Sequence, residues 1–154
     1  MGVEIERKFL VKGDNWRNLA VGTLYRQGYI PTAPGRTVRI RIAGDHGFIT
    51  IKGDAKGISR AEFEYEIPIE DAMQLLDTLC EPPLIEKYRH KINFNGLVWE
   101  VDEFLGANQG LIIAEVELHD ANQAIDRPDW IDQDVSHDSR YYNVNLAKHP
   151  FTQW

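Results

Sequence analysis

The chain is dominated by stretches in which apolar and polar residues alternate with a period of two. Such alternation is typical of β-strands that have one apolar face and one polar face. Short turn-like connections separate several stretches, and Asn95-Gly96 is a pair favoured in tight hairpins. The pattern predicts about eight strands, mostly antiparallel to their sequence neighbours, over residues 2–12, 24–32, 37–43, 47–53, 60–69, 84–94, 97–104 and 111–118.

Four segments carry a helical pattern instead, at residues 14–20, 70–80, 120–125 and 138–149. The second has apolar residues at helical spacing from Ala72 to Leu79 and acidic residues in its first turn. We expect this amphipathic helix to pack on an apolar surface. A surface loop is expected over residues 127–130. No repeat or linker divides the chain, so residues 1–154 are expected to form a single domain.

The bulk composition excludes several classes of function. A net charge of −7 argues against a sequence-independent nucleic-acid binder, because such proteins need a basic surface. No apolar run approaches the roughly 18 residues that a membrane span needs. The single cysteine, Cys80, cannot form an internal disulfide, which favours a reducing compartment. We therefore expect a cytoplasmic protein that binds neither nucleic acid nor membrane.

The charged residues are sorted by sign along one face of each predicted strand. Because alternate residues of a strand share a face, Arg39 and Arg41 lie together opposite apolar neighbours. Glu62 and Glu64 do the same on another strand. Like charges two residues apart repel each other, so an ordinary solvated surface has no reason to sort them in this way. The exception is Arg7, which falls on the apolar face of its strand.

Two architectures accommodate this pattern. An open antiparallel sheet would have its apolar face on the core and its charged face in water. A closed barrel would enclose the charged faces in a lumen and place the apolar faces outside, beneath amphipathic helices. The barrel explains the sorting better, so the predicted fold is a β-dominated α+β fold built on a closed eight-stranded antiparallel barrel. Because dry burial of unpaired charges is costly, the lumen is expected to bind an ionic ligand.

The charged residues also indicate which ligand that is. Several arginines and lysines in one cavity suit an oligophosphate, because guanidinium groups bind two phosphate oxygens at once and ammonium groups are compact charges. The first and last strands instead carry pairs of carboxylates at alternate positions, which can hold hard divalent cations such as Mg²⁺ or Mn²⁺. These carboxylates are Glu4, Glu6, Glu115 and Glu117. A bound cation would screen charge on the reacting phosphorus.

Short blocks spread along the whole chain resemble the CYTH, or triphosphate tunnel, superfamily. The N-terminal block Val3-Glu4-Ile5-Glu6-Arg7-Lys8 resembles the Glu-x-Glu-x-Lys signature of that superfamily. Further blocks follow in the same order at residues 38–41, 50–52, 62–66, 86–89, 99–102, 114–117 and 140–143. One departure is Tyr142, where a small or basic residue is expected in many relatives. This departure leaves open whether the C-terminal helix plugs the tunnel.

The resemblance implies roles for individual residues inside an eight-stranded tunnel. It implies metal binding by Glu4, Glu6, Glu115 and Glu117. It implies phosphate binding by Lys8, Arg39, Arg41, Lys52, Lys87, Arg89 and Arg140. Secondary candidates are Glu62, Glu64, Glu100 and Asp102. Lys8 and Lys87 are also candidates for orienting or deprotonating the attacking water, because a lysine crowded by other cations has a lowered pKa. The alternative is that both stay protonated and only bind phosphate.

The resemblance also implies an activity. Short members of the superfamily are similar to this chain in length and look like inorganic triphosphatases. The expected activity is therefore metal-dependent hydrolysis of a small triphosphate, foremost inorganic tripolyphosphate, to pyrophosphate and phosphate. A class IV adenylyl cyclase or a thiamine triphosphatase acting in the same tunnel is the alternative. A non-catalytic binder of polyphosphate or organic phosphates is a further one, although it would gain nothing from the acidic residues. Both a monomer and a homodimer are compatible with these features.

Overall fold

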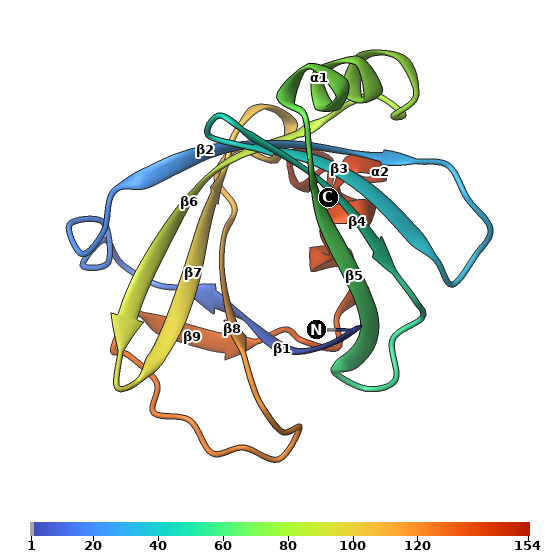
Figure 1. Cartoon of the computed structure of the whole chain (residues 1–154). Coiled ribbons are helices and arrows are strands. Elements are labelled where there is room, and N and C mark those ends of the chain that lie inside the picture. The colour runs from blue at the N-terminus through green and yellow to red at the C-terminus, as the bar shows by residue number, and fades with distance from the viewer. Residues whose placement is uncertain (1) are drawn as a thin grey trace.

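The computed structural model describes residues 2–154, which form nine strands, two α-helices and three short 3₁₀ helices (Figure 1). The strands are β1 (Gly2–Val11), β2 (Gly22–Ile30), β3 (Thr37–Ala43), β4 (His46–Lys52), β5 (Ser59–Ile67), β6 (Ile85–Phe94), β7 (Leu97–Phe104), β8 (Ile112–Glu117) and β9 (Ile131–Asp134). The helices are α1 (Ile69–Thr78), α2 (Asn143–Lys148), η1 (Gly106–Asn108), η2 (Ser139–Tyr141) and η3 (Phe151–Gln153). Strands β1 to β8 match the predicted strands to within one or two residues at their ends.

Strand β1 closes the sheet into a barrel because it pairs with two strands at once. Its first half pairs with β5, where Glu4 lies opposite Arg60. Its second half pairs with β8, where Lys8 lies opposite Glu115. The other neighbours follow the order β5-β4-β3-β2-β6-β7-β8, and the strands run around a common axis in Figure 1. The predicted closed eight-stranded antiparallel barrel is therefore confirmed.

The apolar faces of the strands point outward, so the hydrophobic core lies outside the barrel. Phe9, Trp99 and Trp130 belong to one cluster, and the Trp99 ring centroid lies 5.6 Å from that of Phe9 and 6.1 Å from that of Trp130. A second cluster includes Leu146 of α2. A third lies between α1 and β3 and includes the buried Leu76. Each fully buried side chain of this kind stabilises the fold by roughly 1.5–3 kcal/mol.

Helix α1 confirms the amphipathic helix expected near residues 70–80. It contacts β2, β3 and β4 from outside the barrel, as the upper part of Figure 1 shows. Gly47 of β4 permits this close approach, because a Cβ atom there would lie only 2.7 Å from the Cβ of Ala72. Neither α-helix within residues 2–154 has the length and apolar character that crossing a bilayer requires.

The helix predicted over residues 14–20 is wrong, because this segment forms consecutive turns. Trp16 is fully buried and its ring meets His90 edge-on, with centroids 5.0 Å apart. A helix this short is marginal without tertiary support. The burial of one large ring, and not an apolar helical stripe, therefore organises the segment.

The helix predicted over residues 120–125 is also wrong, and this segment is a turn. The Asp120 carboxylate accepts a hydrogen bond of 2.8 Å from the backbone N–H of Asn122. Side chains of this type stabilise turns at the expense of helices.

The C-terminal region differs from prediction in two respects. The helix expected over residues 138–149 is divided into η2 and α2 by Tyr142, whose backbone is extended. The ninth strand, β9, was not predicted. It follows the loop expected at residues 127–130, which is only partly a surface loop because Pro128 and Trp130 are buried. Strand β9 pairs with β1, and Arg7 Nη2 lies 2.7 Å from Asp134 Oδ2. This ion pair explains why Arg7 occupies the outer face of its strand.

Candidate active site

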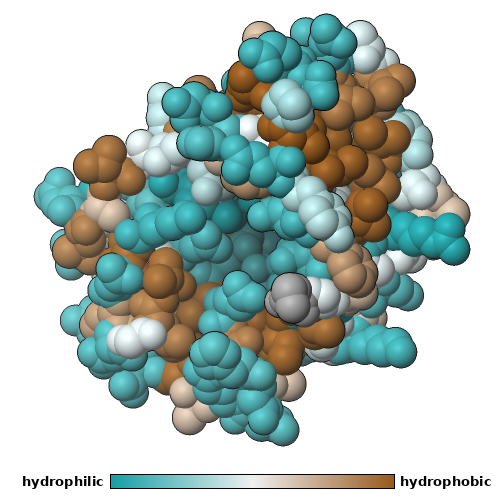
Figure 2. All heavy atoms as spheres, viewed as in Figure 1, coloured by the Kyte–Doolittle hydropathy of each residue, from teal (hydrophilic) through white to brown (hydrophobic). Residues whose placement is uncertain are grey.

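A polar cavity of about 320 Å³ lies inside the barrel, and Figure 2 shows the hydrophilic hollow at the centre of the molecule. The inward faces of the strands form its wall. These faces carry the charged residues, because side chains alternate between the two sides of each strand. The predicted site residues that line it are Glu4, Glu6, Lys8, Arg39, Arg41, Lys52, Glu62, Glu64, Lys87, Arg89, Glu100, Glu115 and Glu117. Acidic and basic groups from distant parts of the sequence therefore face one space.

Asp102 lies behind the cavity wall, where it holds two of the cationic residues. Its carboxylate accepts hydrogen bonds of 2.7 and 2.8 Å from Arg89 and lies 2.7 Å from Lys87 Nζ. Burial disfavours the carboxylate, but the positive charges of Arg89 and Lys87 outweigh this effect and lower the pKa of Asp102. Asp102 is therefore a support for the cavity wall and not a part of its surface.

Arg140 lies outside the cavity, which corrects its expected place among the phosphate ligands. Its Nη2 atom lies 2.7 Å from Asp138 Oδ2, and its guanidinium stacks on Trp154 at 4.8 Å from the ring centroid. Arg140 lies in helix η2, which directs its side chain toward the C-terminus. The alternation that places strand side chains in the lumen does not apply to a residue of a helix.

Two arginines of β3 form the core of the basic wall. Arg39 Nη2 donates hydrogen bonds to Thr50 Oγ1 at 3.1 Å and to Glu64 Oε2 at 3.2 Å. The buried Nε atom of Arg39 has no hydrogen-bond partner among residues 2–154. The wall therefore contains a buried cationic donor whose hydrogen-bonding capacity is not satisfied by the described residues.

Arg41, two residues further along β3, carries positive charge that its surroundings do not neutralise. Its Nε atom donates to Gln27 Oε1 at 2.9 Å, and its guanidinium stacks on Tyr25 at 4.9 Å from the ring centroid. Burial, followed by repulsion from Arg39 and Arg89, lowers the pKa of Arg41 to about 10. A bound anion would relieve this repulsion.

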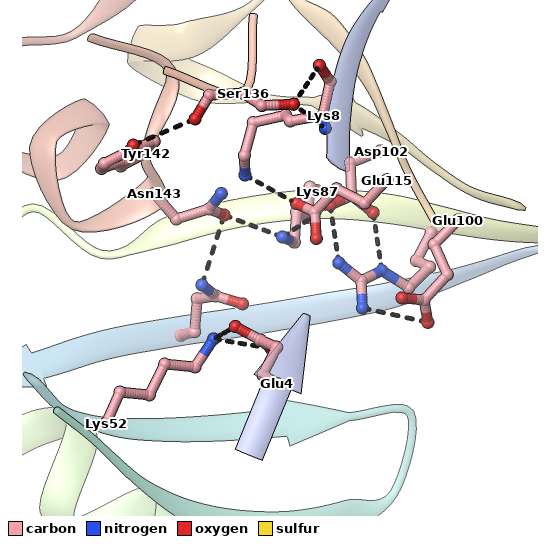
Figure 3. A network of polar contacts seen from close by, with 12 residues as sticks. Glu4, Lys8, Lys52, Lys87, Glu100, Asp102, Glu115, Ser136, Tyr142 and Asn143 are labelled. Atoms are coloured by element: carbon pink, nitrogen blue, oxygen red, sulfur yellow. Dashed lines mark hydrogen bonds and ion pairs between the residues drawn. The ribbon is translucent and has the colours of Figure 1, made fainter. Parts of the chain in front are cut away.

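Two of the four carboxylates expected to bind metal are ion-paired with lysines. Glu4 Oε1 lies 3.1 Å from Lys52 Nζ, and Glu115 Oε1 lies 3.0 Å from Lys8 Nζ (Figure 3). With these carboxylates turned toward lysines, no group of three or more His, Cys, Asp or Glu side chains in residues 2–154 is arranged to hold a metal ion.

The other two carboxylates, Glu6 and Glu117, experience repulsion from their neighbours. Burial, followed by the charges of Glu115 and Glu4, raises the pKa of Glu6 well above its ordinary value of 4.5. Burial, followed by the charges of Glu4 and Glu100, also raises the pKa of Glu117. Added positive charge would relieve this repulsion, and carboxylate oxygens are the donors that hard divalent cations prefer.

The two lysines proposed from sequence to act on water have opposite electrostatic surroundings. Burial lowers the pKa of Lys87 to about 7. The negative charge of Asp102 opposes this shift, but the positive charges of Arg89 and Arg41 counter the effect of Asp102. For Lys8, burial also disfavours the ammonium form, but Glu115 and Glu6 outweigh it and raise the pKa above the ordinary value. Only Lys87 therefore combines a place in the cavity wall with an accessible neutral form.

The C-terminal segment, residues 135–154, closes part of the cavity, a point that the sequence left undecided. Tyr142 and Asn143 line the cavity together with Ser136. The Tyr142 hydroxyl donates to the carbonyl of Ser136 at 3.0 Å, and Lys8 Nζ lies 5.9 Å from the Tyr142 ring centroid. The C-terminal segment is therefore part of the cavity wall.

Sequence reasoning missed several cavity residues besides those of the C-terminal segment. Tyr25 and Tyr29 of β2 line the cavity, and Gln27 between them is fully buried. Arg60 of β5 also lines it and shares the face of Glu62. All four could have been found from the alternation of side chains, because each lies two residues from another inward-facing position of a predicted strand. Tyr25, Gln27 and Tyr29 are uncharged and so lay outside a pattern defined by charge, whereas Arg60 has the opposite sign to the glutamates of its own strand.

Comparison with known proteins places the chain among relatives of the same length. The CYTH domain family matches residues 2–149. The chain is 54% identical over 151 residues to an inorganic triphosphatase from Acetivibrio thermocellus, covering 98% of this chain and 97% of that relative. It is 36% identical over 148 residues to an inorganic triphosphatase from Nitrosomonas europaea, covering 94% of this chain and 96% of that relative.

A solved structure also resembles this fold along nearly the whole chain. The crystal structure of an inorganic triphosphatase superposes with a TM-score of 0.64 at 33% sequence identity, covering 96% of this chain and 95% of that one. The tunnel architecture, the ordered sequence blocks and the full-length matches agree with one another, and the chain belongs to the CYTH domain family.

Proposed function

We propose that this protein is a divalent-metal-dependent triphosphatase that hydrolyses inorganic tripolyphosphate to pyrophosphate and phosphate. The observation that carries the proposal is the meeting of guanidinium, ammonium and carboxylate groups in one cavity of about 320 Å³. A cavity of this volume is typical of a small-molecule site, and phosphoryl transfer depends mainly on positioning and charge neutralisation. The name inorganic triphosphatase, carried by two relatives of matching length, supports the same activity.

The basic wall is the proposed binding surface for the substrate phosphates. Arg39, Arg41 and Arg89 contribute guanidinium groups that bind phosphate oxygens in pairs. Lys8 and Lys52 contribute ammonium groups, which are at present paired with carboxylates. Because a triphosphate competes with those carboxylates for the lysines, substrate binding and release of the carboxylates are expected to occur together.

The proposed metal ligands are Glu4, Glu6, Glu115 and Glu117. Exchange of Lys52 and Lys8 for a cation would complete this donor set, and the raised pKa of Glu6 supports a site that gains from added positive charge. A bound Mg²⁺ or Mn²⁺ would neutralise charge on the phosphate oxygens and on the leaving group.

In the proposed reaction, water attacks the terminal phosphorus in line with the bridging oxygen. A bond forms between the water oxygen and phosphorus, the bond to the bridging oxygen breaks, and pyrophosphate leaves. Lys87 accepts the proton of the water, because its pKa of about 7 leaves much of the amine neutral at neutral pH. Lys8 remains charged and neutralises phosphate oxygens, since Glu115 and Glu6 raise its pKa.

A substrate panel tests the proposal. Purified protein is incubated with tripolyphosphate, ATP, thiamine triphosphate or pyrophosphate, each with Mg²⁺, with Mn²⁺ or with EDTA. We expect one phosphate and one pyrophosphate per tripolyphosphate, fastest turnover on this substrate, and no turnover in EDTA. Cyclic AMP and pyrophosphate from ATP would identify a cyclase instead. Preferred turnover of thiamine triphosphate would reassign the substrate, and tight binding without turnover under every metal condition would identify a non-catalytic binder.

A further inference from the structure

Asn143, the first residue of α2, contacts two side chains of the barrel wall. Its Oδ1 atom accepts a hydrogen bond of 2.8 Å from Lys87 Nζ and one of 3.3 Å from Gln27 Nε2. Figure 3 shows Asn143 extending from the C-terminal segment to Lys87. The contact joins residues that are 56 positions apart in the sequence. A residue outside the barrel strands therefore contacts the lysine that is proposed to receive the proton.

The chemistry of the neighbouring groups determines which atom Asn143 presents to Lys87. A guanidinium group can only donate hydrogen bonds, so Gln27 must present its carbonyl oxygen to Arg41 Nε, 2.9 Å away. The Gln27 amide nitrogen then faces Asn143 and the Tyr29 hydroxyl, which lies 2.9 Å from it. Because this nitrogen donates, Asn143 must present its oxygen. The orientation of both amides is thus set by Arg41.

Two oxygen atoms consequently lie against the Lys87 amine. Asn143 Oδ1 accepts its hydrogen bond, and Asp102 Oδ2 lies 2.7 Å from the same nitrogen. A neutral amine has two N–H groups and one lone pair. If the two oxygens face the two N–H groups, the lone pair points away from both of them. Lys87 belongs to the cavity lining, so a water molecule that approaches from this remaining direction would meet the lone pair.

We infer that Asn143 is a positioning residue for Lys87, which together with Asp102 orients the free position of the amine toward the substrate cavity. This inference rests on the proposed hydrolysis, and it makes the C-terminal segment a working part of the site. Asn143 acts through Lys87 and needs no contact with substrate. Loss of its side chain is therefore expected to lower kcat while leaving KM close to that of the unmodified protein.

Electrostatics provides a readout that a purely structural role would not change. The charged groups that influence Lys87 are Asp102 of β7, Arg89 of β6, Arg41 of β3 and Glu115 of β8. Asn143→Asp would add a carboxylate at hydrogen-bonding distance from the amine with almost no change in shape. An opposite charge this close favours the ammonium form, so the pKa of Lys87 should rise by about one unit or more.

The decisive experiment titrates Lys87 directly. NMR of ¹³Cε-labelled lysine, with the Lys87 signal assigned by its loss in Lys87→Arg, gives the titration midpoint without reliance on turnover. We expect Asn143→Asp to move the midpoint upward by about one pH unit or more. The matched control is Gln153→Glu, which adds the same charge to an exposed position of the C-terminal segment and should leave the midpoint unmoved. An unmoved midpoint in Asn143→Asp overturns the inference.

Kinetics then tests positioning. For Asn143→Ala we expect kcat on tripolyphosphate to fall about tenfold, the worth of one good hydrogen bond, with KM within about twofold. For Asn143→Asp the acidic limb of the pH–rate profile should move upward together with the NMR midpoint, and activity should recover at higher pH. Unchanged kcat and pH limbs in both variants contradict positioning. If the unmodified protein hydrolyses no triphosphate, the proposed function fails, whereas the NMR midpoint still decides whether Asn143 controls Lys87.

Discussion

Asp102 Oδ2 lies 2.7 Å from Lys87 Nζ, and the two side chains are 0% and 1% exposed. The same carboxylate accepts both hydrogen bonds from Arg89. One buried anion therefore stabilises two cations of the cavity wall. A buried charge that loses its partner is far more costly than a surface pair is stabilising, so this cluster should govern both stability and the state of the site.

Asp102→Asn should lower the free energy of unfolding by about 3–5 kcal/mol at pH 7, because it leaves Lys87 and Arg89 without their common anion. Urea denaturation measures this difference. The pKa of Asp102 is below its ordinary value of 3.8 in the folded protein, so its contribution is fully present above pH 3.8 and is lost as the pH falls through the lower, folded-state value. Asp132→Asn, at an exposed position of β9, should change stability by no more than about 0.5 kcal/mol.

Lys87→Arg should reduce kcat on tripolyphosphate by about 100-fold or more, because arginine keeps the charge but cannot supply a neutral amine. Lys8→Arg should retain much of the turnover, since Lys8 acts as a cation. For the unmodified protein, kcat/KM should rise with pH through about 7, where Lys87 loses its proton. The pH–rate profiles of all three proteins check this. Near-normal turnover and an unshifted profile in Lys87→Arg would remove Lys87 as the base.

Arg41→Ala should weaken tripolyphosphate binding by about 1.5–3 kcal/mol, the usual worth of a charge-assisted hydrogen bond. Isothermal titration in a metal-free buffer measures the affinity without turnover. The matched control is Arg26→Ala, because Arg26 lies on the neighbouring strand β2, pairs with Glu86 at 3.6 Å and does not belong to the cavity lining. Equal affinities for the Arg41 variant and the unmodified protein would exclude Arg41 from the phosphate site.

Glu6→Gln should abolish metal-dependent activity, with kcat/KM lower by at least about 100-fold, because it removes one of the proposed metal ligands. The same variant should be more stable than the unmodified protein at pH 7 without metal. The pKa of Glu6 is raised in the folded state, so its charge opposes folding above its ordinary value of 4.5, and the gain should disappear below that pH. Thermal unfolding at pH 4 and pH 7 checks the sign. Full activity with Mg²⁺ or Mn²⁺ would contradict the assignment of Glu6.

The sequence by itself determined the strands and the side of the wall on which each strand residue lies. Strand geometry alternates side chains strictly, so residues such as Arg39 and Glu115 could be assigned to the lumen from parity alone. The closed barrel was predicted from the sorting of charge, since a lumen explains like charges gathered along one face better than an open sheet does. The alternation of side chains gives no information outside strands, which is why the expected place of Arg140 had to be corrected. Strand β9, which has only four residues, was missed.

Only the tertiary structure decided how these groups act on one another. Lys8 and Lys87 look alike in the sequence, yet one lies beside Glu115 and the other beside two arginines, and their pKa values move in opposite directions. Such shifts depend on distances between strands that are far apart in the chain. The contact between Asn143 and Lys87 has the same origin, because it exists only when the C-terminal segment folds back on the barrel.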